Sequence, residues 1–142
     1  MRLFLDANVL FTAAHNPRGK AALTIELGKE GYWTLATSRY ASEEARRNLE
    51  RKFPRSQEGL GSLLRGIHLV EHRPQHRFPA GLAEKDRPIF QAAVASGATH
   101  LLTGDLKDFG PFMNRPEETF GILVQTVADF LRSASSSGGR IP

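Results

Sequence analysis

The sequence contains no cysteine among its 142 residues. Disulfide bonds, thiolate nucleophiles and zinc sites built on thiolates are therefore excluded. The first apolar stretch, Leu3 to Leu5, meets Asp6 after only three residues, which is too short for the core of a signal peptide or for a membrane span. These absences lead us to expect a soluble, cytoplasmic protein that does not associate with a membrane.

The composition is that of an ordinary globular chain, with 40 % hydrophobic and 24 % charged residues, far from the low hydrophobicity and high charge of disordered segments. A chain of this length can bury roughly 65–70 % of its unfolded surface in one core. We expect a single domain over residues 1–132. The small polar residues of 133–142 predict a disordered tail.

The charge balance is mildly basic. Lys and Arg number 19 against 15 Asp and Glu, which gives a net charge of +4 and an isoelectric point near 9.9. Such a surplus favours polyanionic partners such as nucleic acid, but it also serves ordinary solubility. Charge alone therefore does not identify the function.

Short apolar runs alternate with helical patterns along the whole chain. We expect strands over residues 3–5, 33–36, 67–70, 100–102 and 122–124. We expect helices over residues 7–14, 20–28, 39–53, 56–65, 87–96 and 127–132, and a loop over residues 72–79. This alternation predicts an α/β fold in which a central parallel sheet is covered by helices on both faces.

Two of the predicted strands end in aspartate. Leu3 to Leu5 leads into Asp6, and the strand at 100–102 leads through Thr103 and Gly104 into Asp105, with Asp108 shortly after. In open parallel sheets, ligands bind beyond the carboxyl ends of the strands. Two further acids belong to helices that follow this same edge: Glu44, and Asp86 just before the helix at 87–96. We expect these carboxylates to converge.

Carboxylates that converge repel one another, at a cost of about 1 to 4 kcal/mol for a pair 4 Å apart. A hard divalent cation, Mg²⁺ or Mn²⁺, offsets that repulsion and prefers oxygen ligands. Such an ion polarises a phosphoryl oxygen and activates a water, which predicts phosphodiester hydrolysis. Asn8 and Thr103 lie two residues from the strand-end aspartates, where they can orient a carboxylate or a water.

Each of these acids also has a purely structural interpretation. Asp6 and Asp86 can cap the helices that follow them, and Asp105 and Asp108 can be turn residues beside Gly104. Glu43 competes with Glu44, although Glu44 borders the apolar side of its helix, and Glu84 competes with Asp86. We favour Asp6, Glu44, Asp86 and Asp105 as catalytic, metal-binding residues, with Asp108 as an additional metal ligand.

Histidine and arginine supply two weaker signals. His68, His72 and His76 recur at four-residue spacing, but Pro74 interrupts any helix there, so we expect a surface loop rather than a metal site. The helix at 39–53 and the residues just after it are rich in basic side chains, which can contact phosphates or simply keep the protein soluble. The candidates for RNA binding are Arg46, Arg47, Arg51 and Lys52.

Four segments together resemble the PIN-domain family: Phe4-Leu5-Asp6-Ala7-Asn8, Glu44-Ala45-Arg46-Arg47-Asn48-Leu49, Lys85-Asp86, and Leu102-Thr103-Gly104-Asp105-Leu106-Lys107-Asp108-Phe109. The resemblance spans nearly the whole chain. It implies a three-layer α/β/α PIN-like fold, Mg²⁺ or Mn²⁺ as cofactor, and endonucleolytic cleavage of RNA. Asp6, Glu44, Asp86 and Asp105 match the acidic quartet of that family, and Asp108 matches an additional acid.

The family is best known for VapC-type toxins of toxin–antitoxin pairs. The resemblance therefore implies RNA as substrate and a cognate antitoxin as partner, and a homodimer is a further possibility. Two alternatives stay open. The first is a haloacid-dehalogenase-like phosphatase, in which Asp6 would be the nucleophile, although Asn8 stands where that family has a second aspartate. The second is an inactive PIN fold that binds RNA or protein without cutting.

Overall fold

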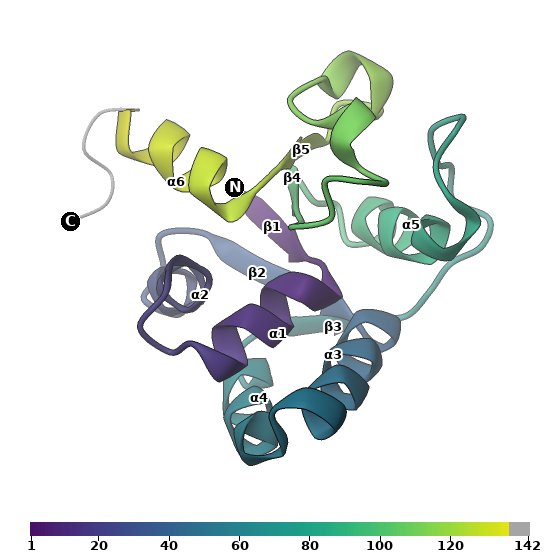
Figure 1. Cartoon of the computed structure of the whole chain (residues 1–142). Helices are drawn as coiled ribbons and strands as arrows, with labels where there is room; N and C mark the ends of the chain where they lie inside the picture. Colours follow the sequence, from purple (N-terminus) through teal and green to yellow (C-terminus); the bar gives the residue numbers. More distant parts are fainter. Residues whose placement is uncertain (137–142) are drawn as a thin grey trace.

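A computed structural model of the chain describes residues 1–136 (Figure 1). The last helix, α6 (Val127–Ser136), continues four residues beyond Arg132, where the sequence pattern predicted the domain to end. Residues 137–142 of the predicted disordered tail lie outside the described residues. Within residues 1–136, no helix combines the length and the apolar character needed to cross a bilayer.

A five-stranded sheet forms the centre of the molecule. Its strands are β1 (Arg2–Leu5), β2 (Thr34–Ser38), β3 (His68–Val70), β4 (His100–Leu102) and β5 (Leu123–Gln125). They lie in the order β3-β2-β1-β4-β5, and every neighbouring pair is parallel. The predicted central parallel sheet is therefore confirmed, with the strands at the predicted places.

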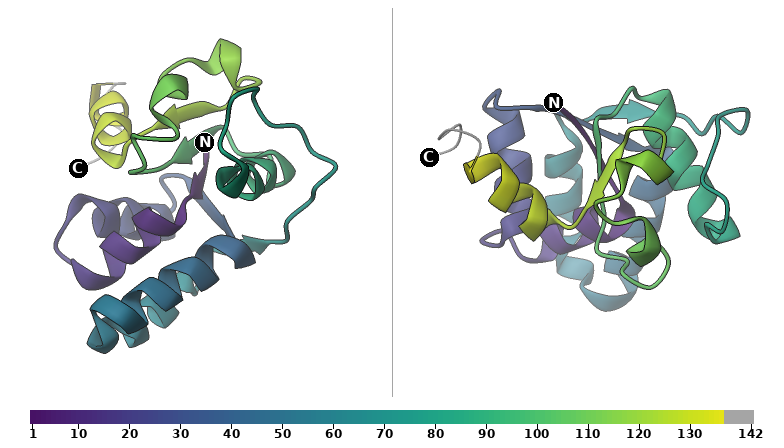
Figure 2. Two further views of the ribbon diagram at one scale, coloured as in Figure 1. Left: turned by 45° about the vertical axis from the view of Figure 1, so that its right-hand side comes forward. Right: turned by 90° about the horizontal axis from the view of Figure 1, so that it is seen from above.

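Helices cover both faces of this sheet (Figures 1 and 2). One face carries α1 (Ala7–His15), α2 (Lys20–Lys29), α3 (Arg39–Lys52) and α4 (Gln57–Leu64), and the other carries α5 (Arg87–Ala95). Short 3₁₀ helices that the sequence pattern did not predict lie at Pro54–Ser56, Glu84–Asp86, Gly110–Phe112 and Pro116–Glu118. The arrangement is the predicted three-layer α/β/α fold.

The core lies between the sheet and its helices. Leu3, Phe4 and Leu5 of β1 are fully buried, as expected for a central strand that is covered on both faces. On α5, small side chains are buried too, including Ala92 and Ala93 at 0 % exposure. Small side chains there let this helix lie close to the sheet.

The strand order reverses direction at β1. From β1 the chain builds outward to β2 and β3, and it then crosses back to place β4 on the other side of β1. The gap beyond the carboxyl ends of β1 and β4 is therefore a topological switch point, the usual place for a ligand site in such sheets. Asp6 and the turn Thr103 to Asp105 follow these two strands directly.

Candidate metal centre

Asp6 is held rigidly at the end of β1. It is the N-cap residue of α1 and is only 4 % exposed. Its Oδ1 accepts a hydrogen bond of 2.7 Å from the backbone N–H of Ala7. Its Oδ2 accepts one of 2.7 Å from the Thr103 hydroxyl and one of 3.2 Å from the Asn8 amide. The capping interpretation therefore holds for one oxygen, while the other faces the end of β4.

Thr103 and Asn8 join the ends of β1 and β4. The Thr103 Oγ1 also accepts hydrogen bonds from the Asp105 backbone N–H at 3.0 Å and from Asn8 Nδ2 at 3.3 Å. The Asn8 Oδ1 accepts one of 2.6 Å from the Gly104 N–H. A side chain at Gly104 would press on this contact, because an added Cβ would lie 3.3 Å from Asn8 Oδ1. These bonds fix Asp6 and orient the turn that carries Asp105.

Three other carboxylates gather beside this turn. Asp86, Asp105 and Asp108 each offer one oxygen, and these oxygens lie within 4.8 Å of one another. Asp86 comes from the 3₁₀ helix before α5, whereas Asp105 and Asp108 come from the loop after β4. Asp6 and Glu44 are not members of this tight group. The structure thus divides the five predicted ligands into a group of three and two neighbours.

The ammonium group of Lys85 sits among these three aspartates. Its Nζ lies 2.7 Å from Asp108 Oδ2, 3.2 Å from Asp86 Oδ2 and 3.6 Å from Asp105 Oδ2. The sequence pattern predicted no role for Lys85. Its position beside Asp86 in the chain is the only local signal, and a lysine next to an aspartate is too common to identify it.

Burial and neighbouring charges shift the pKa values of several groups in the site. Burial, opposed by the Thr103 hydrogen bond and reinforced by the charges of Glu44 and Asp105, raises the pKa of Asp6 to about 6. Burial and a hydrogen bond with Asp108 raise the pKa of Asp86 to about 6. The hydrogen bond from Lys85 lowers the pKa of Asp108, and the same contact raises the pKa of Lys85.

Glu44 reaches the site from α3. Its charge contributes to the raised pKa values of both Asp6 and Tyr40, so it faces the carboxylate edge. Tyr40, one turn earlier, donates a hydrogen bond of 3.2 Å from its hydroxyl to the Lys85 carbonyl. The competing Glu43 instead forms an ion pair with Arg46 at 3.1 Å. Of the two neighbouring glutamates, Glu44 is therefore the one directed toward the other acids.

The structure also tests the capping role of Asp86 and the turn role of Asp105. Asp86 precedes α5, but its side chain forms no capping hydrogen bond, and Glu84 is exposed. The Asp105 Oδ1 does accept a turn hydrogen bond of 3.0 Å from the Asp108 N–H, while its Oδ2 faces Lys85. Whether these acids bind a metal stays a prediction.

The basic residues of α3 differ in how they are engaged. Arg46 pairs with Glu43 at 3.1 Å and with Glu50 at 3.4 Å, and Arg51 donates to Asn48 at 2.9 Å. Lys52 lies over the ring of Phe11. Arg47 is exposed and its charge acts on Tyr40, which places it on the side of the helix nearest the acids. Arg47 is thus the best placed of the four for a phosphate near the site.

The three histidines do not form a metal site among residues 1–136. His68 belongs to β3, and His72 and His76 lie in the loop that follows. The buried Gln91 holds this loop, with its Oε1 2.8 Å from the His72 ring and its amide donating to the carbonyls of Pro74 and His76. The predicted surface loop is confirmed.

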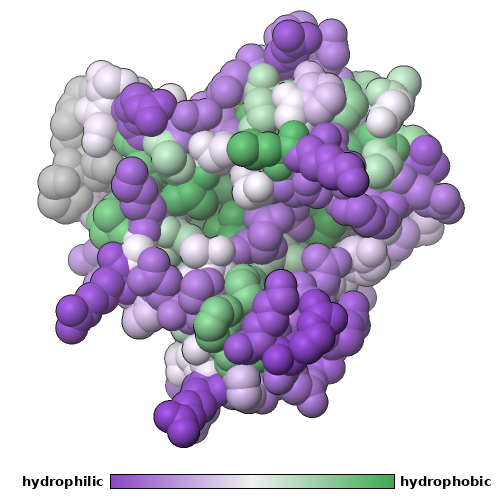
Figure 3. All heavy atoms as spheres, in the orientation of Figure 1, coloured by the Kyte–Doolittle hydropathy of each residue, from purple (hydrophilic) through white to green (hydrophobic). Residues whose placement is uncertain are grey.

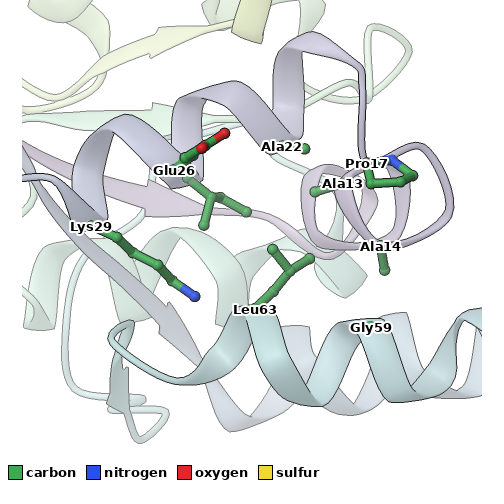
Figure 4. Close-up of a pocket in the computed structure, with 9 residues that line it drawn as sticks. Ala13, Ala14, Pro17, Ala22, Glu26, Lys29, Gly59 and Leu63 are labelled. Atoms are coloured by element: carbon green, nitrogen blue, oxygen red, sulfur yellow. The ribbon is translucent and has the colours of Figure 1, made fainter.

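Two of the hollows in the surface lie beside α1 and α2. One, with a volume of about 490 Å³, adjoins the site and is lined by residues of α1, α2, α6 and the turn after β4, including Asn8, Lys20 and Thr103. In Figure 3, apolar atoms gather in a recess between α6 and the helices α1 and α2. The other, of about 290 Å³, lies between α1, α2 and α4 and contains none of the clustered acids (Figure 4).

The donor set suits a hard cation. Among the described residues, the group contains carboxylate oxygens and no sulfur or imidazole, which is the chemistry that Mg²⁺ and Mn²⁺ prefer. A single lysine provides one positive charge against three aspartates. The residues present therefore fit a divalent ion of this class.

Comparisons with known proteins give a structural likeness alone. No family model matches the chain, and no curated protein matches it. Among solved structures, a chain of VapBC2 from Rickettsia felis, determined bound to a DNA fragment from its promoter, is 17 % identical with a TM-score of 0.61, covering 89 % of this chain and 98 % of that one. A chain of VapBC-1 from nontypeable Haemophilus influenzae is 16 % identical with a TM-score of 0.58, covering 90 % and 99 %.

These likenesses cover about nine tenths of the chain. The chain has the three-layer α/β/α, PIN-like fold that the solved VapBC chains share. At this level of identity the likeness establishes the fold, and function has to be argued from the site itself.

Proposed function

We propose that the protein is an endoribonuclease of the VapC type that depends on Mg²⁺ or Mn²⁺ and hydrolyses phosphodiester bonds in RNA. The observation that carries this proposal is the convergence of acids from four separate segments at the switch point between β1 and β4. Keeping so many carboxylates together is costly unless a cation joins them. Their presence in a basic chain suits a polyanionic substrate.

In this proposal Asp86, Asp105 and Asp108 hold the ion together with the neighbouring Asp6 and Glu44. A bound divalent ion polarises a phosphoryl oxygen and lowers the pKa of a nearby water. Thr103 and Asn8 keep the inward oxygen of Asp6 in place through their hydrogen bonds. Arg47, on the helix that carries Glu44, binds a phosphate of the RNA as it passes the acids.

The test is incubation of the purified protein with structured and unstructured RNA, with Mn²⁺ or with a chelator. Cleavage should require the metal, and Asp6→Asn and Asp105→Asn should each slow it by about 100-fold or more, because each removes a charged ligand. The chain offers a matched control in two adjacent glutamates. Glu44→Gln should slow cleavage strongly, whereas Glu43→Gln should leave it near the parent rate. Equal rates for the aspartate variants and the parent would refute the site.

A cognate antitoxin is proposed as the partner. The support is the resemblance of the motifs to VapC-type proteins, together with the fold shared with chains of VapBC structures. If a small neighbouring gene encodes a DNA-binding protein, its purified product should form a stoichiometric complex with this chain and suppress RNA cleavage. Unchanged cleavage with such a protein in excess would contradict the pairing.

The same experiments also test the two other candidate functions. A phosphatase using Asp6 as nucleophile would form a phosphoenzyme, but Asn8 stands where that family has a second aspartate. A binding module would retain RNA in the presence of chelator and give no cleavage products with any divalent metal. The intact set of acids favours the nuclease over both.

A further inference from the structure

The Lys85 ammonium occupies the centre of the aspartate group. Its Nζ lies 2.7, 3.2 and 3.6 Å from the Oδ2 atoms of Asp108, Asp86 and Asp105, respectively. These three residues are also the described group whose oxygens lie close enough together to hold one metal ion. The lysine is therefore bound to the same carboxylates that the proposed function assigns to a divalent ion.

An ammonium group fits among these aspartates but does not neutralise their charge. Lysine is a compact point charge with three N–H donors. Its Nζ lies within hydrogen-bond distance of Asp86 and Asp108, whereas Asp105 at 3.6 Å is an ion-pair partner only. Its single charge leaves the group with an excess of negative charge, which a divalent ion would offset better. Mg²⁺ binds oxygen at about 2.0–2.1 Å, so both cations would have to use the same oxygens at close range. Repulsion between them makes simultaneous occupation unfavourable.

The side chain of Lys85 can leave while its backbone stays in place. The side chain is 67 % exposed, so only its charged end is inserted among the acids. The backbone is fixed by the Tyr40 hydroxyl, which donates to the Lys85 carbonyl at 3.2 Å, and by the 3₁₀ helix Glu84–Asp86. A change of side-chain rotamer is therefore sufficient to clear the group, and no segment of the chain has to move.

We propose that Lys85 is a resident counter-ion that holds the aspartate group together without metal and is displaced when a divalent ion binds. This rests on the proposed function in one respect, namely that a divalent ion binds these carboxylates. The lysine competes with that ion and raises the metal concentration at which the site fills. Lys85 thus regulates loading of the site.

The experiment compares Mn²⁺ binding to the parent and to Lys85→Met by electron paramagnetic resonance of free Mn²⁺, without RNA. Methionine keeps the length of the stem and removes the charge. Because the competing cation is gone, Lys85→Met should bind Mn²⁺ about tenfold more tightly or better. Lys85→Arg, which keeps the charge, should stay within about threefold of the parent.

Lys107→Met is the matched control. Lys107 is exposed beside Asp108, and replacing it by methionine changes the net charge by the same amount as Lys85→Met. Among the described residues, however, no ion pair joins Lys107 to the aspartates. Its Mn²⁺ affinity should change by less than about twofold, because exposed charges are screened. Thermal unfolding gives a second measure: without metal, Lys85→Met should melt below the parent, and saturating Mn²⁺ should remove the difference.

The outcomes separate the two proposals. If the parent binds Mn²⁺ and cleaves RNA, but Lys85→Met binds Mn²⁺ equally or more weakly, the counter-ion role is overturned and the nuclease stands. A similar gain for Lys107→Met would also overturn it, because the effect would then be general charge. If neither the parent nor Lys85→Met binds Mn²⁺, both proposals fail.

Discussion

The two halves of the carboxylate site are held together by different means. Around Asp6, the contacts are buried hydrogen bonds between neutral donors and one carboxylate, contributed by Ala7, Asn8 and Thr103. Around Asp86, Asp105 and Asp108, the contacts are ion pairs to one exposed lysine. We call the first the buried half and the second the open half.

Because the two halves are held by different contacts, we expect one to affect mainly stability and the other mainly ligand binding. Buried hydrogen bonds to a charged group contribute strongly to folding, because losing one leaves the charge without compensation. Ion pairs to an ammonium that is itself 67 % exposed contribute less, and that cation is easily exchanged for another, although the side chains of its aspartate partners are only 9–21 % exposed. The buried half should therefore control the stability of the metal-free protein, and the open half should control which cation is present.

The largest effect is expected from Thr103→Val, which keeps the shape of a fully buried side chain and removes its hydroxyl. The Asp6 carboxylate then loses its shortest side-chain donor, and the Asp105 N–H loses its acceptor. We expect a loss of about 2–3 kcal/mol in the free energy of unfolding. Urea unfolding in chelator, followed by the fluorescence of the buried Trp33, measures it.

Thr12→Val on the exposed side of α1 is its control and should change the free energy of unfolding by less than about 0.5 kcal/mol. Lys85→Met tests the other half and should cost about 1 kcal/mol or less without metal, because the ammonium is largely exposed. A larger loss for Lys85→Met than for Thr103→Val would reverse the comparison.

The second effect concerns the charge on Asp6. Its pKa is about 6 in the folded protein against the ordinary 3.8, mainly because of burial. Between these values the folded state binds the proton more tightly than the unfolded state, so the stability of the metal-free protein falls as pH rises from about 4 to about 6. Above that window the full cost of the buried charge is present, and below it the cost is absent.

Asp6→Asn should therefore stabilise the metal-free protein at about pH 7.5, by about 1–2 kcal/mol. The gain should be smaller than the pKa shift alone implies. The amide that replaces the carboxylate places a donor next to the Asn8 amide, so the hydrogen bond that Asn8 donates to Asp6 is lost. The gain should vanish at about pH 4, where the parent carboxyl is also neutral. Urea unfolding at the two pH values measures this, and a gain that persists in acid would show that charge is not its cause.

The smallest effect distinguishes two adjacent arginines beside the open half. Arg47→Ala should weaken RNA binding and reduce the slope of log affinity against log salt by about 0.7, the loss of one contact to a single strand. Arg46 is engaged by Glu43 and Glu50, so Arg46→Ala should change the slope less. Filter binding with a chelator present, over a range of salt concentrations, measures both. Equal slopes for the two variants would contradict the placement of Arg47.

The fold could be predicted because its signals are local. Apolar runs of three or four residues mark the strands, and helical spacing with breaks at Asn16 and Pro54 marks the helices between them. The short 3₁₀ helices were missed because a single turn carries no periodicity. The end of α6 was placed too early, because Ser133, Ser135 and Ser136 are weaker helix formers than the residues before them, yet the helix continues to Ser136.

The candidate site could be predicted only in outline. Asp6 and Asp105 follow buried strands, and the carboxyl edge of a parallel sheet brings such residues together. The position of Lys85 could not be predicted, because it depends on pairing residues from two segments that only the folded sheet brings together. The choice of Glu44 over Glu43, in contrast, could be made from the sequence, because Glu44 borders the apolar side of its helix.

The most direct test of the account is anomalous diffraction from crystals soaked in Mn²⁺. We expect a manganese peak bound by oxygens of Asp105 and at least one other acid of the group, with the Lys85 ammonium moved away from the aspartates. Aspartates that remain paired with Lys85, without a manganese peak at saturating metal, would contradict it.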